Sequence, residues 1–125
     1  MALLTRDQIL NFNDLKTELV PTPEWDGSVM VRGLTAQERD QFEQSLYTTR
    51  KVGNGFETIP NKKDNVRAKL VSMVCIDEKG ELLFDAACID ILCKKSAAPI
   101  DRIFTVAQKL SGFSKTDIEE IEKNS

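Results

Sequence analysis

The chain is organised around residues 96–112, which have the sequence SAAPIDRIFTVAQKLSG. Ser96 can accept a hydrogen bond from an unpaired amide at a helix start, and Pro99 suits the first turn. Gly112 supplies the left-handed residue that ends many helices. Between these signals, apolar residues recur at helical spacing: Ile100, Ile103, Phe104, Ala107 and Leu110. The stretch therefore predicts one amphipathic helix, and we expect its apolar stripe to form the main wall of the core.

Length and composition describe an ordinary globular protein. The chain has 125 residues, of which 41% are hydrophobic and 30% are charged, and its formal net charge is −3. This size fits a single domain over residues 1–125. The negative charge argues against nonspecific nucleic-acid binding, and no apolar run approaches the ~20 residues of a membrane span. Because charged residues begin at Arg6, we expect no signal peptide and a cytoplasmic location.

The cysteines do not predict a metal site. There are three of them, Cys75, Cys88 and Cys93, without a C-x-x-C pair, and the chain has no histidine. A structural zinc site needs about four Cys or His ligands. Each cysteine lies among apolar residues, where Cys behaves as a small hydrophobe. We therefore expect reduced core cysteines, no metal and no cofactor.

Two capping boxes predict the starts of helices, because a threonine and a Glu or Gln three residues later satisfy each other's backbone amides. The first box, at Thr5, predicts a short helix over about residues 6–11. The second, at Thr35, predicts a helix that runs to about Thr49. We expect this second helix to pack peripherally, because its apolar stripe is narrow. The stripe consists of Phe42, Leu46 and Tyr47.

A β-hairpin is predicted between these two helices. Residues 16–20 favour a strand weakly, and β-branched residues alternate over residues 28–32. The Asp-Gly pair at residues 26–27 is a strong signal for a two-residue turn. Pro21 and Pro23 cannot donate hydrogen bonds to a ladder, so the first strand should lie at the edge of its sheet.

The middle of the chain predicts a loop and then a helix. Residues 51–60 contain two glycines and Pro60 without apolar periodicity, which favours a mobile loop. A helix should follow from about residue 61 or 62 to Cys75. A strand over residues 71–76 stays open as an alternative, because a short apolar run does not settle the period.

Two more short helices complete the expected fold. Asp85 can cap one over about residues 86–94, whose inward side chains would be Ile89, Leu92 and Cys93. The last one begins near Ser114 and carries only two apolar residues, Ile118 and Ile121. With the hairpin, these elements predict an α+β fold, a mainly helical small domain with an N-terminal antiparallel β-hairpin.

No catalytic arrangement is apparent in the sequence. The chain lacks histidine, a G-x-S-x-G elbow, a P-loop and a dinucleotide glycine pattern. Lys94 and Lys95 follow Cys93, but lysines at a helix end are already favoured by the helix dipole. We therefore expect a protein that is not an enzyme.

Basic residues cluster over residues 50–69. There are six of them against Glu57 and Asp64: Arg50, Lys51, Lys62, Lys63, Arg67 and Lys69. A solvated surface explains them best, because no ladder of aromatic residues accompanies them as a stacking platform would require. The alternative is a small nucleic-acid-associated phage or bacterial protein that uses this basic stretch.

A few apolar residues lie where a partner could reach them. They are Trp25 beside the hairpin turn, Phe56 in the expected loop, and Ile118 and Ile121 on the thin last helix. An aromatic residue at a turn more often packs onto its own domain. Tryptophan is nevertheless enriched at binding hot spots, so these four residues are the candidate protein-binding residues.

Four segments carry a family resemblance. They are LLTRD at residues 3–7, WDGSVMVRGLT at residues 25–35 with ERD at residues 38–40, NVRAKLV at residues 65–71, and KSAAPIDRI at residues 95–103 with SG at residues 111–112. Together they resemble the tail assembly chaperones of long-tailed, siphovirus-like bacteriophages and prophages. The resemblance spans most of the chain and brings no catalytic residues with it.

This resemblance implies a role in building the phage tail. Proteins of this family coat the tape measure protein, a long helical chain that aggregates easily, and keep it soluble. They help bring tail tube subunits to it and then leave, so that they are absent from the mature virion. The expected partners are therefore the tape measure protein, the tail tube protein and other copies of this chain, in the host cytoplasm.

Overall fold

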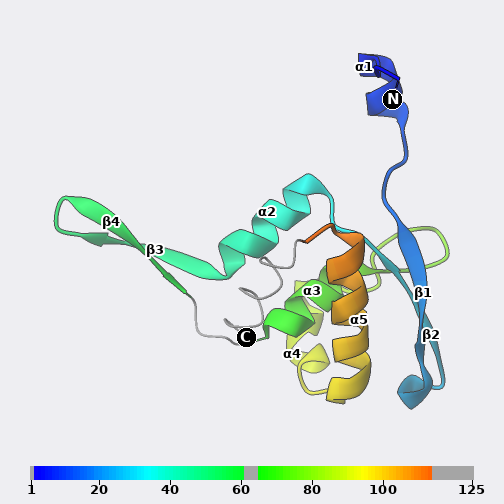
Figure 1. The fold of residues 1–125 in the computed structure, drawn as a ribbon. Helices are drawn as coiled ribbons and strands as arrows, with labels where there is room; N and C mark the ends of the chain where they lie inside the picture. The colour runs from blue at the N-terminus through cyan, green and yellow to red at the C-terminus, as the bar shows by residue number, and fades with distance from the viewer. Residues whose placement is uncertain (1, 61–64, 114–125) are drawn as a thin grey trace.

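The computed structural model describes residues 2–60 and 65–113, with the backbone alone over residues 47–49 and 58–60. The fold is α+β, with the expected antiparallel hairpin near the N-terminus (Figure 1). Its elements are α1 (Arg6–Asn11), β1 (Thr17–Thr22), the 3-10 helix η1 (Pro23–Trp25), β2 (Gly27–Arg32), α2 (Ala36–Ser45), β3 (Tyr47–Val52), β4 (Gly55–Pro60), α3 (Val66–Val74), β5 (Cys75–Ile76), the 3-10 helix η2 (Ala86–Cys88), α4 (Ile89–Leu92) and α5 (Ala97–Leu110).

A three-stranded antiparallel sheet in the order β1-β2-β5 supports one side of the helices. Because successive side chains in a strand point to opposite faces, Val20 and its partner Val29 share a face with Val31. Val20 and Val31 are buried on that face, against the helices. The prediction that the Pro-containing strand lies at an edge is confirmed, since β1 pairs only with β2 among the described strands.

The turn of this hairpin differs from the expected two-residue turn. Gly27 pairs with Thr22 and already belongs to β2. Four residues connect the strands instead, three of them in η1 and the fourth, Asp26, in the left-handed region at φ 58°. Pro23 begins the 3-10 helix, where its missing N–H is not needed.

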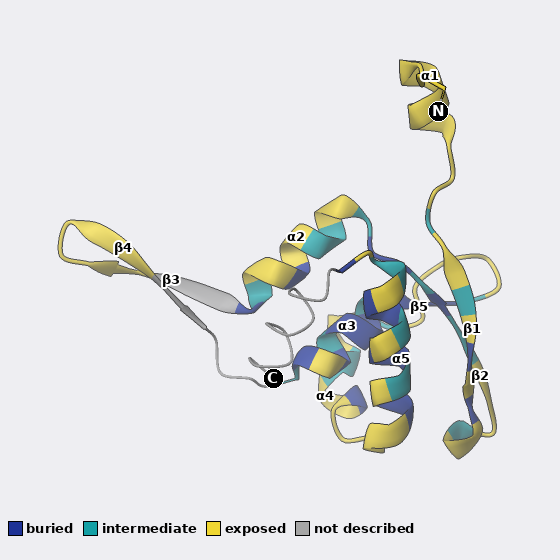
Figure 2. Cartoon of the chain, in the orientation of Figure 1, coloured by how far each residue is buried: buried dark blue, intermediate teal, exposed yellow. Residues whose placement is uncertain are grey.

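Helix α5 forms the central wall of the core, as its stripe predicted (Figure 2). Ile103 and Phe104 are 0% and 3% exposed. The helix ends in a Schellman motif, in which the amides of Gly112 and Phe113 donate to the carbonyls of Lys109 and Gln108. Gly112 has φ 73°, as expected of a residue in that position. The N-terminal expectation is only partly met, because Ser96 is the N-cap residue but its side chain makes no capping hydrogen bond.

Charged side chains of α5 cover the free edge of β1. Arg102 forms two hydrogen bonds to the carboxylate of Glu24, at 3.0 and 3.1 Å, and a third to the carbonyl of Pro21. Lys109 reaches Glu18 at 2.8 Å. The hydrogen bond from Arg102 lowers the pKa of Glu24. The edge that could have accepted a strand from another chain is thus partly occupied by this chain's own helix.

Helix α2 has the predicted capping box but is shorter than expected. It ends at Ser45, because β3 begins at Tyr47. Phe42 of its narrow stripe is the one buried residue within the described helix: it is 1% exposed and packs edge-on against Phe113, with ring centroids 6.4 Å apart. Arg32 fastens the helix start to β2 through two bonds to Glu38, at 2.7 and 2.8 Å, and these bonds lower the pKa of Glu38.

In place of the loop expected over residues 51–60, the chain forms a β-hairpin there. β3 and β4 pair along their whole length as an antiparallel hairpin, with Gly53 in the turn at φ 59°. Figure 1 shows this hairpin extending away from the helices, on the side opposite the three-stranded sheet. Mobility of this segment stays a prediction.

The choice between helix and strand over residues 71–76 has a mixed answer. α3 continues to Val74, and Cys75 and Ile76 then form β5 beside β2. The expected helix start at residues 61–62 lies outside the described residues, and α3 begins at Val66 after Asn65 at φ 68°. Leu82 pairs with Ile76 in an isolated antiparallel bridge.

The segment capped by Asp85 is helical over residues 86–92, first as η2 and then as α4. Leu92 is buried as predicted, but the expectation that Cys93 points inward is wrong, because Cys93 is exposed. Cys93 is the residue at which α4 ends, and its thiol donates to the carbonyl of Asp90 at 3.0 Å. The expected last helix, from Ser114, lies outside the described residues.

The difference between Cys75 and Cys93 gives a first testable prediction. Burial raises the pKa of Cys75 to about 12, so its thiol stays protonated and enclosed at neutral pH. In the native protein we expect a maleimide to modify Cys93 and to leave Cys75 unmodified until urea unfolds the chain. Peptide mass spectrometry of timed samples measures this. Equal labelling rates at the two residues would contradict the core position of Cys75.

Candidate protein-binding surfaces

Trp25 lines a small apolar cavity at the turn end of the N-terminal hairpin. The cavity is about 300 Å³ in volume. The other side chains around it come from the segment between β5 and α5: Phe84, Cys88, Ile91, Leu92 and Lys95. Trp25 is half-buried against the core, whereas Ile91 is 60% exposed at the cavity rim. The structure therefore brings the predicted Trp25 together with an exposed apolar residue that the sequence analysis did not single out.

Phe56 lies on a different surface, near the tip of the β3–β4 hairpin. It is 78% exposed and stands directly opposite Lys51. Residues that pair directly share a face of the ribbon, so Lys51 and Phe56 lie on the same face. Arg50 and Glu57 form an ion pair at 3.2 Å on the other face. The two remaining candidates, Ile118 and Ile121, lie outside the described residues.

Two further apolar surfaces were missed from the sequence. Residues 2–14 are exposed throughout, and the arm that they form carries five large apolar side chains, which are Leu3, Leu4, Ile9, Leu10 and Phe12. The second surface is the face of the three-stranded sheet turned away from the helices, where Leu19 is 59% exposed. The alternation of β1 could have indicated this face, because Leu19 and Val20 must point to opposite sides.

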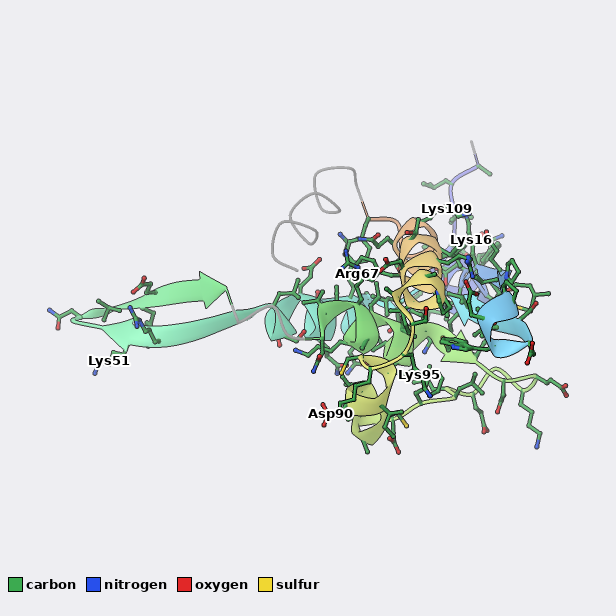
Figure 3. The ribbon with its side chains drawn as sticks, turned by 90° about the horizontal axis from the view of Figure 1, so that it is seen from below. Lys16, Lys51, Arg67, Asp90, Lys95 and Lys109 are labelled. Atoms are coloured by element: carbon green, nitrogen blue, oxygen red, sulfur yellow. The ribbon has the colours of Figure 1, made fainter. Side chains whose placement is uncertain are left out.

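The basic residues of the stretch 50–69 do not form one patch among the described residues. Lys51 is at the hairpin tip, while Arg67 is on α3, far from it in Figure 3. Arg67 is bonded to Asp101 at 2.9 Å and lies over the ring of Phe104 at 5.5 Å. Arg67 therefore helps to hold α3 against α5. Lys62 and Lys63 lie outside the described residues.

A metal site and a membrane-spanning helix are both absent from the described part of the chain. No three His, Cys, Asp or Glu side chains gather there as a possible metal site. Within the same residues, no helix has the length and apolar character that crossing a bilayer requires. What the described surface offers is a set of apolar and charged patches, which suits contacts with other proteins.

A family model described as phage tail assembly chaperone matches residues 5–124, which is nearly the whole chain. The chain belongs to this family. It is thus a bacteriophage protein of tail assembly, and the resemblance noted in the sequence is confirmed. The family is one of chaperones and not a class of enzymes. Comparisons with curated proteins and with solved structures found no match.

Proposed function

We propose that this chaperone binds the tape measure protein in many copies along its length and keeps it soluble. It would act in the cytoplasm of the host bacterium, help bring tail tube subunits to the coated tape measure protein, and leave before the virion is complete. Membership of the family supports chaperoning of tail proteins in general. The identity of the partners follows from the family resemblance and forms part of this proposal.

The observation that carries the proposal is the apolar cavity beside Trp25. A helical partner binds by laying an apolar ridge into a groove, with anchors one helical turn apart. An enclosed apolar space of about 150 Å³ holds a benzene-sized group, so the roughly 300 Å³ here accommodates one or two large apolar side chains. Ile91 at the rim would extend the contact along the partner helix, and Lys95 could pair with an acidic residue of it.

A single contact of this size is weak, and the length of the partner compensates for that. Only a handful of residues around Trp25 are available to each copy. The area they can bury is therefore far smaller than the ~800 Å² per partner of a standard interface. When many copies bind one long chain, each bound copy covers apolar helix surface that would otherwise aggregate. Binding in many copies also raises the local concentration of chaperone for the neighbouring sites.

The test is co-purification with the tape measure protein of the same phage from cells that express both. We expect Ile91→Arg to reduce the recovered tape measure protein about tenfold or more, because it places a charge at the rim of the cavity. Ile91 is 60% exposed, so this change should not affect folding. The matched control is Val52→Arg on β3, where the side chain is 49% exposed and does not line the cavity.

Each outcome is decisive for the assignment. Loss with Ile91→Arg and retention with Val52→Arg supports the cavity as the binding site. Equal recovery with both variants would show that the tape measure protein binds elsewhere. If the wild-type chaperone recovers no tape measure protein, the proposed partner itself is wrong.

A further inference from the structure

The β3–β4 hairpin presents two different faces. Lys51 and Phe56 occupy one face as a directly opposed pair. Lys51 makes no ion pair with any described residue, since the ion pair of this hairpin joins Arg50 and Glu57. The second face carries Arg50 and Glu57, whose charges neutralise each other, and the apolar Val52. The hairpin tip is therefore cationic and aromatic on one side only. A two-stranded ribbon is marginally stable by itself in water, so a partner for this face would also stabilise the hairpin.

The groove on the open face of the sheet has the complementary chemistry. Its volume is about 840 Å³. Its apolar floor is formed by Leu19, Met30 and Ile76, one from each strand of the sheet. The loop over residues 77–81 forms its wall and carries three carboxylates against one lysine: Asp77, Glu78 and Glu81 against Lys79. An exposed aromatic ring flanked by a cation fits a groove with an apolar floor and an acidic wall.

The hairpin tip and this groove cannot meet within one chain. Figures 1 and 3 both show the β3–β4 hairpin on one side of the helices and the β1-β2-β5 sheet on the other. Lys51 is drawn at the far end of the hairpin in Figure 3, apart from every other labelled residue. A contact between two different surfaces of identical molecules is heterologous, and it continues from copy to copy as a row or a ring.

We propose that the hairpin tip of one copy docks into the sheet groove of the next copy. Phe56 rests on Leu19 and Met30 of the neighbour, and Lys51 faces Glu78 and Glu81. The inference goes beyond the proposed function, because it concerns the contact between copies and requires no tape measure protein. A chaperone that lines up head to tail would be suited to coating a long chain.

The size of the contact sets its expected strength. Besides Phe56, few side chains of the hairpin tip enter the groove, so each contact buries less than the ~600 Å² per partner typical of weak, transient complexes. Self-association should therefore be reversible and should increase with protein concentration. On a long partner, neighbouring copies would be held close together, which would make the same weak contact effective.

Sedimentation velocity of the purified full-length chaperone over a wide concentration range tests this inference. We expect the mean mass of the wild type to rise with concentration. Phe56→Ala and Lys51→Glu should each weaken association by about tenfold or more, since the second change turns an attraction into a repulsion. Val52→Ala, on the opposite face of the same hairpin, is the matched control and should associate like the wild type.

A mixing experiment tests the head-to-tail geometry. One variant carries Lys51→Glu and Phe56→Ala and keeps an intact groove; the other carries Glu78→Lys and Glu81→Lys and keeps an intact hairpin. Alone, each should stay monomeric. Mixed, they should form one-to-one complexes and nothing longer, because only one productive contact remains.

The results that would contradict this inference differ from those that would contradict the proposed function. A wild type that stays monomeric at every concentration, or a mixture that stays monomeric although the wild type associates, contradicts the docking of the hairpin in the groove. Either result leaves co-purification with the tape measure protein unaffected. Conversely, a chaperone that self-associates but recovers no tape measure protein supports this inference and removes the proposed function.

Discussion

Replacing Phe104 by alanine should lower the free energy of unfolding by about 3–5 kcal/mol. Phe104 is 3% exposed in the middle of α5, within the hydrophobic core. Truncation removes its buried ring and leaves a cavity that the surrounding helices can close only in part. The ring also supports the guanidinium of Arg67, which lies 5.5 Å from the ring centroid.

Urea unfolding of both proteins measures this loss. Thr105→Ala is the control on the same helix, because Thr105 is exposed and its hydroxyl bonds only to the carbonyl of Asp101. This control should change the free energy of unfolding by no more than about 0.5 kcal/mol. A loss below about 1 kcal/mol for Phe104→Ala would show that the α5 stripe is not the centre of the core.

The second large effect is expected at Gly33, where the chain leaves β2. A Cβ atom there would lie 2.6 Å from the carbonyl oxygen of Leu110 and 3.0 Å from its carbon. Both neighbours are backbone atoms of α5, which cannot move aside as the end of a flexible side chain could. The same junction is held by the hydrogen bond from the Leu34 amide to the Ser111 hydroxyl, at 3.0 Å.

Gly33→Ala should therefore cost about 3 kcal/mol of stability, the upper part of the range for overpacked sites. Gly55→Ala provides the matched control, because its nearest atom would be 4.0 Å away and its φ is not positive. Thermal and urea unfolding of the two variants compare them directly. Gly33→Ala with wild-type stability would mean that β2 and α5 do not approach each other this closely.

Elements with complete local signals were predicted correctly from the sequence. Helix α5 has apolar residues at helical spacing and a glycine that forms its Schellman motif. The boxes at Thr5 and Thr35 begin α1 and α2 as expected. Each of these features depends on residues within a few positions of one another, so no knowledge of tertiary contacts was needed.

The β3–β4 hairpin was missed because its strands lack apolar alternation. Residues 47–60 are largely polar, and residues 50–57 are exposed on both faces of the ribbon, so this part carries no period of buried residues. The Asn-Gly pair at residues 54–55 was a turn signal that could have indicated a hairpin. The narrow stripe of α2 was a usable signal, because Phe42 and Leu46, which it contains, are both buried.

The candidate surfaces depend on contacts between distant segments, which the sequence shows only in part. Trp25 and Phe56 could be selected as single residues by type and position. The cavity beside Trp25 could not, because Phe84 and Ile91 reach it from a segment about 60 residues away in the chain. The sheet groove likewise requires β5 and the loop after it to lie beside β2.

The most direct test of the central claim is the solubility of the tape measure protein in bacteria, with and without this chaperone. The tape measure protein is expressed alone, with the wild type and with Ile91→Arg, and its soluble and sedimented fractions are quantified. We predict that it is mostly sedimented alone and with Ile91→Arg, and mostly soluble with the wild type. Equal solubility of the tape measure protein in all three samples would contradict the proposed chaperone function.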